Sequence, residues 1–262
     1  MRKSFGNIHV YQAQNLKSYD TIIHGFAPYV ESVTKPLDLH RNNVSEYETF
    51  CEKIKTPLTH MCLVKQVHKD DILVIKKNEI PAGVYPSGGW DLHSGTSLKK
   101  FRAQEFDAII TNQKNVLLGI TTADCIPLVL FDPKTLTIGA IHGGWKSTAL
   151  KIAEKTVKKM KEEFKVDPKN ILAALGPGIC RRCFEVGIDV ASKFQKEFLE
   201  RKDDHKFKLD LCSVHEAHLE SAGVPSHNIE TLNLCTFHYE TKFFSYRRDK
   251  TEKRHLNFIM LK

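Results

Sequence analysis

The sequence predicts an α/β (α+β) fold in which helices and mixed β-sheets stack in layers. Short apolar stretches with strand-forming residues recur along the chain, between amphipathic helical patterns. Asp132–Thr135 has the composition of a tight turn, so Ile126–His142 is predicted to form a β-hairpin. Hairpins mixed with helices argue against a simple βαβ repeat. The predicted strands are Thr21–Phe26, Thr59–Lys65, Ile72–Ile75, Asp107–Thr111, Val116–Thr121, Ile126–Phe131, Thr137–His142, Ile171–Leu175, Ile229–Leu234 and Leu256–Leu261.

Three segments have the apolar periodicity of helices. Trp145–Phe164 places apolar residues three or four apart and fills its other face with Lys and Glu. Ile188–Leu199 carries a second apolar stripe. A third helix begins near Ser213, which forms a capping box with Glu216, and ends before Gly223 and Pro225.

Composition limits the classes of protein that this chain can belong to. The 262 residues are 41% hydrophobic and 27% charged, which is typical of a folded globular protein. The Gly- and Pro-rich stretch 81–95 is predicted to be a surface loop within one domain. Apolar runs are too short for a membrane helix, and the N-terminal residues lack a signal-peptide pattern. Seven cysteines without a disulfide-like spacing predict reduced thiols and a cytoplasmic location.

The chain has an excess of positive charge, with a net charge of +8. Such a charge favours anionic partners, among them phosphate and phosphorylated metabolites. The Lys-rich stretch Lys151–Lys165 alternates with Glu and apolar residues, as the exposed face of a helix does. No nucleic-acid motif accompanies the charge, so we expect neither a nucleic-acid nor a membrane partner. The sequence leaves the oligomeric state open.

A metal site is predicted where the two strands of the hairpin meet. Cys125 and His142 occupy neighbouring strand ends, which lie about 5 Å apart in an antiparallel pair. His68 follows another predicted strand. Two His and one Cys leave a tetrahedral zinc ion one open position, as in catalytic sites. The alternative is a buried thiol beside two hydrogen-bonded histidines.

The residues after His142 resemble a phosphate loop only in part. Gly143 and Gly144 lead into a predicted helix, whose first N–H groups can bind an anion. A nucleotide phosphate loop needs Gly directly before Lys-Ser/Thr, but here Trp145 precedes Lys146. We therefore retain an anion site and reject a nucleotide-binding loop.

Two further His and Cys patterns match known motifs incompletely. His215 and His218 are one residue too close for a zinc-protease helix and are predicted to be surface residues. Cys180 and Cys183 form a single CxxC pair. They could bind a structural zinc ion with Cys212 and Cys235, although those two lie singly and far away in the sequence. The nucleobase-deaminase pattern HxE…PCxxC is absent from the sequence.

A C-terminal segment, Phe243–Asp249, combines aromatic residues, the Ser245 hydroxyl and two arginines. Guanidinium groups bind phosphate or carboxylate through paired hydrogen bonds, so Arg247 is a candidate anion ligand. The alternative is a surface strand with an Arg–Asp pair.

Ten motifs in order over nearly the whole chain resemble the polyphenol-oxidase "laccase-domain" family, whose bacterial members are also called peptidoglycan editing factors. They are His24–Phe26, Gln66–His68, Asp107–Thr111, Thr122–Pro127, His142–Lys146, Leu175–Ile179, Cys183–Val186, Leu209–Leu211, Leu234–Thr236 and Phe244–Asp249. The resemblance implies one laccase-domain-like purine nucleoside phosphorylase domain over residues 1–262, folded as an α/β/β/α sandwich. It implies a zinc ion on His68, Cys125 and His142; the older laccase label would place copper there. It also assigns Cys183 to the motif after Gly-Pro, which weakens a separate zinc site.

The resemblance implies phosphorolysis of adenosine, inosine and methylthioadenosine, and hydrolytic deamination of adenosine. Purine nucleosides and inorganic phosphate are then the partners. Asp124, next to a ligand, is the candidate general acid/base. Arg247, Lys146 and the amides of Gly143 and Gly144 are expected to hold phosphate. The expected substrate contacts also include Gln66 and Ser245.

The chain departs from the family pattern at three places. After His24–Phe26 the family has Ser-Thr-Arg and a Gly-Gly turn, whereas this chain has Ala27–Ser32. Ser147 replaces a Gly, and Lys253 replaces the Gly of a Gly-Arg pair. The metal ligands are unaffected, but substrate preference and rate are open.

Three other functions fit the same residues. Cys125 and His142 could form a metal-independent dyad, as in cysteine hydrolases or deamidases. The chain could instead be a non-catalytic factor in the editing of cell-wall precursors. A copper polyphenol oxidase is a third alternative, although multicopper oxidation needs more histidine ligands.

Overall fold

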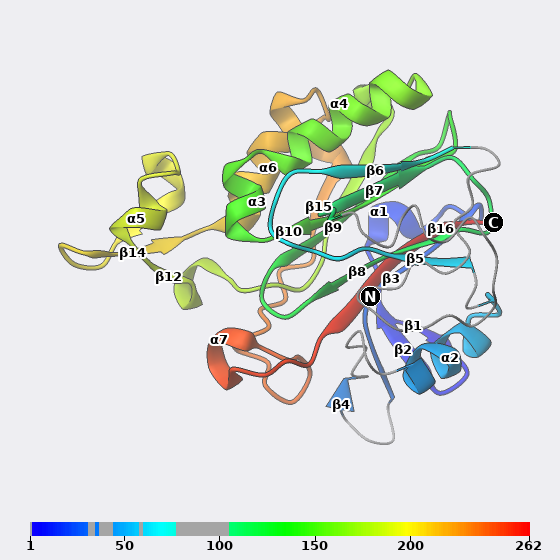
Figure 1. The fold of residues 1–262 in the computed structure, drawn as a ribbon, viewed down its shortest axis with the longest axis horizontal. Helices are drawn as coiled ribbons and strands as arrows, with labels where there is room; N and C mark the ends of the chain where they lie inside the picture. Colours follow the sequence, from blue (N-terminus) through cyan, green and yellow to red (C-terminus); the bar gives the residue numbers. More distant parts are fainter. Residues whose placement is uncertain (1, 31–34, 37–43, 58–59, 77–104) are drawn as a thin grey trace.

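The computed structural model describes residues 2–30, 35–36, 44–57, 60–76 and 105–262. Two large mixed sheets lie face to face, and helices cover their outer sides (Figure 1). This arrangement confirms the predicted α/β/β/α layering. The predicted loop 81–95 and Thr59, the first residue of a predicted strand, lie outside the described residues.

One sheet has seven strands in the order β1-β2-β3-β16-β8-β5, with β4 paired to β3. Only the β5–β8 pair is parallel among the pairs described in this sheet. The strands are β1 (Arg2–Phe5), β2 (Ile8–Tyr11), β3 (Ile22–Val30), β4 (Lys35–Pro36), β5 (Met61–Leu63), β8 (Leu117–Thr122) and β16 (His255–Leu261).

The second sheet has six strands in the order β15-β11-β9-β10-β7-β6. They are β6 (Ile72–Ile75), β7 (Ala108–Thr111), β9 (Ile126–Asp132), β10 (Thr137–Gly143), β11 (Leu172–Leu175) and β15 (Ile229–Thr231). The predicted hairpin is confirmed as β9 and β10, whose pairing runs from Thr137 opposite Asp132 to Gly143 opposite Ile126. Cys125 and His142 therefore lie at the same end of the hairpin.

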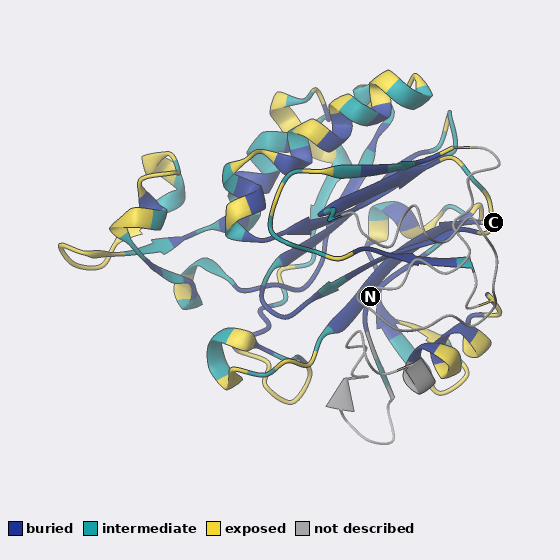
Figure 2. Cartoon of the chain, in the orientation of Figure 1, coloured by how far each residue is buried: buried dark blue, intermediate teal, exposed yellow. Residues whose placement is uncertain are grey.

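Alternate residues of the central strands enter different layers of the core, because successive side chains of a strand point to opposite faces. Val129 and Phe131 of β9 pack between the two sheets. Leu128 and Leu130 of the same strand pack under the helices. A third cluster, which includes Phe50, covers the outer face of the seven-stranded sheet. The central strands of both sheets are consequently the most buried part of the molecule (Figure 2).

The helices differ more from prediction than the strands do. They are α1 (Gln14–Lys17), α2 (Val44–Lys53), α3 (Trp145–Ala149), α4 (Ile152–Phe164), α5 (Ile188–Ala191), α6 (Leu211–Ser221) and α7 (Tyr246–Asp249). The single helix predicted over Trp145–Phe164 is divided into α3 and α4 by Lys151, which has a left-handed φ of 61°. The predicted capping box is wrong: Asp210 is the N-cap of α6 and accepts a hydrogen bond from the Ser213 amide.

The prediction of a helix over Ile188–Leu199 is also wrong after its first turn. After α5 ends at Ala191, the chain continues to β13 (Leu199–Arg201) and β14 (Lys206–Leu209), which form a small antiparallel sheet with β12 (Glu185–Gly187), the strand before α5. Ile188 is 58% exposed, so the predicted apolar face is not buried as a unit. This small sheet and α5 project from the two-sheet body (Figure 1).

Candidate functional site

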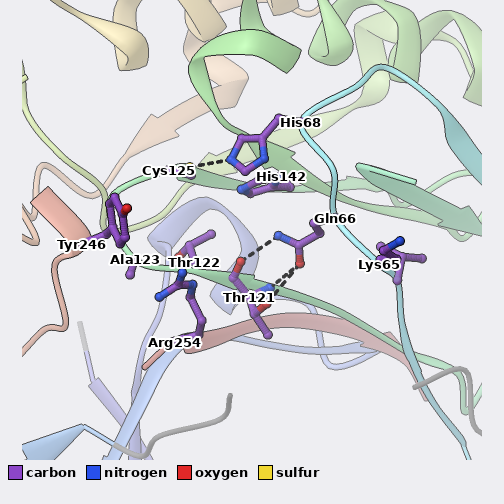
Figure 3. A pocket seen from close by; sticks show the side chains of 11 residues that line it. Lys65, Gln66, His68, Thr121, Thr122, Ala123, Cys125, His142, Tyr246 and Arg254 are labelled. Carbon is purple, nitrogen blue, oxygen red and sulfur yellow. Dashed lines mark hydrogen bonds between the residues drawn. The ribbon is translucent and has the colours of Figure 1, made fainter. Parts of the chain in front are cut away.

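The site lies where the β9–β10 hairpin ends. Cys125 immediately precedes β9, His142 is in β10, and His68 comes from the segment after β5. The Nε2 atom of His68 is 3.8 Å from the Cys125 Sγ. One donor atom from each of the three residues lies within 4.8 Å of the others. Figure 3 shows the three side chains next to one another at the pocket. The structure thus brings together the three predicted metal ligands.

A buried carboxylate, Asp107, holds two of these ligands in place. Its Oδ1 atom is 2.7 Å from the Nδ1 of His142, and the same carboxylate accepts hydrogen bonds from the amides of residues 67–69. Because Nδ1 of His142 donates to Asp107, its Nε2 lone pair is left for a metal ion. From the sequence, Asp107 was predicted only as the first residue of a strand and of a family motif, with no role at the site. The signal that could have found it is an acid directly before a fully buried strand, β7.

The electrostatics of the cluster favour charged ligands in spite of their burial. Burial by itself raises the pKa of the Cys125 thiol, but the adjacent His142 and hydrogen bonds from His142 and His68 lower that pKa below its ordinary value. Burial likewise opposes protonation of His142, whereas Cys125 and Asp107 raise its pKa. Cys125 and His142 therefore stabilise a thiolate–imidazolium pair when no metal is bound.

One residue of the cluster, His68, and one residue next to it in the sequence, Asp124, have strained backbone conformations. His68 has a φ of 62° and Asp124 a φ of 91°, values that non-glycine residues seldom adopt. Three hydrogen bonds to Asp107 hold the backbone around His68, and two hydrogen bonds hold the side-chain carboxylate of Asp124. Strain of this kind concentrates at functional sites, where the surrounding structure maintains it.

The glycines after His142 are required by close packing. A Cβ atom on Gly143 would lie 2.3 Å from the Nε2 of His215, and one on Gly144 would lie 2.5 Å from the Cδ2 of His68. Both distances are far below van der Waals contact, so the two glycines admit these rings. The role of their amides in anion binding stays a prediction.

Two cavities meet at the cluster. One has a volume of 420 Å³ and is polar on its far side, where Gln66, Thr121 and Arg254 line it (Figure 3). The other has a volume of 580 Å³. Its lining includes the following aromatic, aliphatic and charged residues: Trp145, Phe184, Leu211, Asp124, Arg247 and Lys250. His68, Cys125, Ala123 and Tyr246 line both cavities.

Gln66 lines the first cavity but is already bonded to its neighbour. Its Nε2 donates to the Thr121 carbonyl at 2.8 Å, and its Oε1 accepts from the Thr121 amide at 2.9 Å. The side chain thus joins the segment after β5 to β8. Any contact of Gln66 with a substrate would be made from this fixed position.

Asp124 and Arg247 lie together in the wall of the second cavity. The Oδ1 of Asp124 accepts a hydrogen bond from the Thr236 hydroxyl, and its Oδ2 accepts one from the Arg247 amide, both at 2.6 Å. The guanidinium of Arg247 lies 5.0 Å from the centre of the Phe184 ring and donates to the Glu185 carbonyl. These two hydrogen bonds fix the position of the Asp124 carboxylate, whose residue directly precedes Cys125.

Ser245 and Lys146, which are predicted substrate contacts, have different surroundings. Ser245 is buried, and its hydroxyl caps α7 by accepting the Arg248 amide at 3.2 Å. The alternative of a surface strand is wrong for this segment, because Tyr246–Asp249 forms α7, but the Arg–Asp pair of that alternative is present between Arg248 and Asp249. Lys146 is exposed, with its ammonium 5.5 Å from the Trp145 ring centre.

The predicted surface position of His215 is wrong. Its side chain is fully buried, with Nε2 2.9 Å from the Thr148 hydroxyl, and it packs against Gly143 behind the site. The sequence pattern did not predict this burial, because it results from the packing of α3 and α4 against one face of α6. His218 is intermediate in exposure.

The fold and the site define a layered α/β protein with a His–Cys–His group at the end of a central hairpin, between two cavities. The family described as multi-copper polyphenol oxidoreductase laccase matches residues 35–262. The chain therefore belongs to this family of enzymes, which confirms the resemblance seen in the sequence.

Individual relatives extend the comparison. A purine nucleoside phosphorylase of Clostridium acetobutylicum is 38% identical over 164 residues, which cover 60% of this chain and 68% of that protein. Adenosine deaminase RL5, from an unknown prokaryotic organism, is 37% identical over 150 residues, covering 54% of this chain and 56% of that protein. The structure of YfiH from Bacillus licheniformis superposes with a TM-score of 0.79 at 26% identity, covering 98% of this chain and 97% of that one.

None of the helices in the described part of the chain combines the length and the apolar character that crossing a membrane requires.

Proposed function

We propose that this chain is a zinc-dependent purine nucleoside enzyme, which cleaves adenosine, inosine and methylthioadenosine with phosphate and deaminates adenosine to inosine. The observation that carries the proposal is the His68–Cys125–His142 group between two cavities. The names of the relatives, purine nucleoside phosphorylase and adenosine deaminase, support both reactions. The proposed enzyme is one domain over residues 1–262.

The donor set fits zinc better than copper. Two imidazole nitrogens and one thiolate are zinc ligands of the catalytic type, and they leave one position open. Asp107 supplies the hydrogen-bond partner that metal-bound histidines regularly have. Zinc, when bound, would supply Lewis-acid chemistry and lower the pKa of water to about 7.

In this proposal, different residues of the two cavities bind different parts of the substrates. Trp145, Phe184 and Leu211 offer apolar surface to a purine ring. Arg247 and Lys250 on the same wall, with nearby Lys146, supply positive charge for phosphate. This proposal places the reacting centre beside Cys125.

Hydrogen bonding and proton transfer fall to residues beside the cluster. Gln66, whose amide is held by Thr121, would bond the base or the ribose from the first cavity. Asp124 is the proposed general acid/base, held by Thr236 and the Arg247 amide.

All seven cysteines are free thiols in the structure, which supports a cytoplasmic site of action.

Product analysis by liquid chromatography and mass spectrometry tests the proposal. Zinc-loaded protein is incubated with adenosine, with and without phosphate, beside a Cys125→Ala variant and a Cys212→Ala control, which changes a cysteine outside the His68–Cys125–His142 group. We expect inosine without phosphate, and adenine plus ribose-1-phosphate with it, from the wild type and the control but not from Cys125→Ala. Absence of turnover in the zinc-loaded wild type would contradict the proposal.

A metal-independent hydrolase is the second candidate, because the lowered pKa of Cys125 and the raised pKa of His142 are typical of a thiolate–imidazolium dyad. Chelation separates the two functions. A zinc enzyme loses activity when stripped and regains it with zinc, whereas a dyad enzyme keeps its activity. Recovery with copper instead of zinc would favour the oxidase alternative.

A further inference from the structure

A second group of metal-binding side chains lies outside the site described above. Cys180, Cys183, Cys235 and His238 place one donor atom each within 4.8 Å of one another. Cys183 Sγ is 3.2 Å from the His238 Nε2, and Cys180 Sγ is 3.8 Å from the His238 Nδ1. Cys212, which the sequence offered as a fourth ligand, is not part of this group.

Two short turns of the chain present these four side chains. Cys180 is the N-cap and Cys183 the last residue of a single 3-10 turn, in which the Cys183 amide donates to the Cys180 carbonyl at 3.0 Å. Cys235 and His238 have the same spacing, and the Tyr239 amide closes a turn on the Cys235 carbonyl at 3.2 Å. The sequence therefore contains a CxxC and a CxxH pair that converge, a spacing typical of zinc sites.

Backbone contacts hold the two turns side by side. Gly178 and Cys235 form a parallel bridge, and the Thr236 amide donates to the Gly178 carbonyl at 3.0 Å. The Cys180 amide points at the Cys235 sulfur, 3.4 Å away. The cluster is thus an organised feature of the fold, built from segments that are 55 residues apart.

The chemistry of the four donors fits a structural zinc ion. Three thiols and one imidazole are a standard tetrahedral set, with Zn–S bonds of about 2.3 Å and Zn–N bonds of about 2.0–2.1 Å. The four donors leave no coordination position for water or substrate, in contrast to the three donors at the hairpin end. A disulfide between Cys180 and Cys183 would leave Cys235 and His238 without a role in the cluster.

We propose that Cys180, Cys183, Cys235 and His238 bind a second zinc ion, which is structural and fixes one wall of the active-site cavity. Residues next to the two turns form hydrogen bonds with Asp124, which lines this wall. Ile179 donates its amide to the Asp124 carbonyl at 2.8 Å, and the Thr236 hydroxyl bonds the Asp124 carboxylate. A metal ion joining the two turns would hold Asp124 from both sides.

Native mass spectrometry of zinc-loaded protein tests this proposal independently of catalysis. We expect two zinc ions on the wild type and one on Cys125→Ala, because that variant retains all four ligands of the second cluster. Cys183→Ser should also retain one ion, the double variant none, and the Cys212→Ser control two. If Cys183→Ser does not fold, the ion on Cys125→Ala still decides the question.

Substitution of cobalt(II) for zinc shows whether thiolates bind the ion that remains on Cys125→Ala. Cobalt(II) bound to Cys125→Ala should show intense thiolate-to-metal charge-transfer absorption, and this band should be missing after the further change Cys183→Ser. Cys125→Ala protein without zinc, or an intact mass reduced by the two hydrogens of a disulfide, would overturn the proposal. A wild type with one ion that Cys125→Ala keeps and Cys183→Ser loses would instead contradict the zinc at the hairpin end.

Discussion

Asp107 is a single buried carboxylate that organises both sides of the proposed zinc site. It bonds the ring of His142 and the amides of the segment that carries His68. Burial alone would raise its pKa, but hydrogen bonds and the charge of His142 lower that pKa, so the carboxylate is ionised and accepts all of these bonds. Metal affinity should therefore depend on a residue that does not touch the metal.

The substitution Asp107→Asn removes this charge with little change in size. We expect zinc affinity at the hairpin end to fall about 10–100-fold, because the second partner of His142 is weakened and its tautomer is no longer imposed. Competition with a chromogenic chelator measures the affinity.

Glu105→Gln is the matched control for this change. Glu105 lies two residues earlier on the same segment, where it pairs with Lys65 and Lys69 at the surface. The control should bind zinc as the wild type does. Equal affinities for Asp107→Asn and Glu105→Gln would show that Asp107 does not orient the ligands.

At the level of secondary structure, α4 is bounded by two residues in the left-handed conformation. Lys151 precedes the helix with a φ of 61°, and Lys165 follows it with a φ of 59°. Side-chain clashes make this conformation unfavourable for residues other than glycine. The break at Lys151 separates α3, where Ser147 and Thr148 bond backbone carbonyls, from the apolar face of α4.

Replacing Lys165 by Gly should stabilise the protein. Glycine adopts the left-handed conformation at a helix C-terminus without a steric penalty, so we expect the free energy of unfolding to rise by about 0.5–1 kcal/mol. Lys161→Gly removes the same charge inside α4, where glycine should lower stability by about 1 kcal/mol. Urea denaturation measures both, and a change of the same sign in the two variants would contradict the argument.

Across the whole molecule, the layered core buries histidines that must remain neutral. Burial lowers the pKa of His24 from 6.5 to about 4 and that of His255 to about 3. The charge of Lys3 acts in the same direction on His24, as do those of Arg254 and Arg248 on His255. His255 accepts the Phe244 amide on Nε2 and has the Thr122 carbonyl near Nδ1, so the neutral ring satisfies both nitrogens.

Because burial keeps these histidines neutral in the folded protein, we expect the protein to lose stability in mild acid. Below pH 6.5 the unfolded chain binds a proton at each of them, whereas the folded chain does not until the pH approaches about 4 for His24 and about 3 for His255. Each histidine should then contribute a decrease of up to about 1.4 kcal/mol per pH unit, and no change above pH 6.5.

Urea midpoints between pH 7 and pH 5 test this expectation. His255→Gln should reduce the dependence of stability on pH, whatever its effect on stability at pH 7. His227→Gln, which replaces an exposed histidine, should leave the dependence unchanged. Identical pH dependence in all three proteins would exclude burial of neutral His255 as a cause.

Most strands of the two large sheets, the pairing of the hairpin and the family were predictable from sequence patterns. The strands β1, β2 and β4 and the small sheet of β12, β13 and β14 were not predicted. Apolar runs such as Ile126–Phe131 are buried on both faces, and Asp132–Thr135 makes a turn from its own residues. The helix ends were less predictable. Ser213 matches a capping pattern, but Asp210 caps α6. Ile188–Leu199 has a helical period, but only Ile188–Ala191 is α-helical, and a 3-10 turn at Lys196–Phe198 leads into β13 at Leu199.

The sequence alone was sufficient for the layered α/β class and for the meeting of Cys125 with His142, since both follow from short-range periodicity and hairpin geometry. Contacts between distant segments needed the folded chain. Asp107 reaches His142 across neighbouring strands, His215 is buried by other helices, and His238 joins Cys180 and Cys183 over 55 residues or more. No local pattern encodes such neighbours, because the packing of sheets and helices brings them together only when the whole core forms.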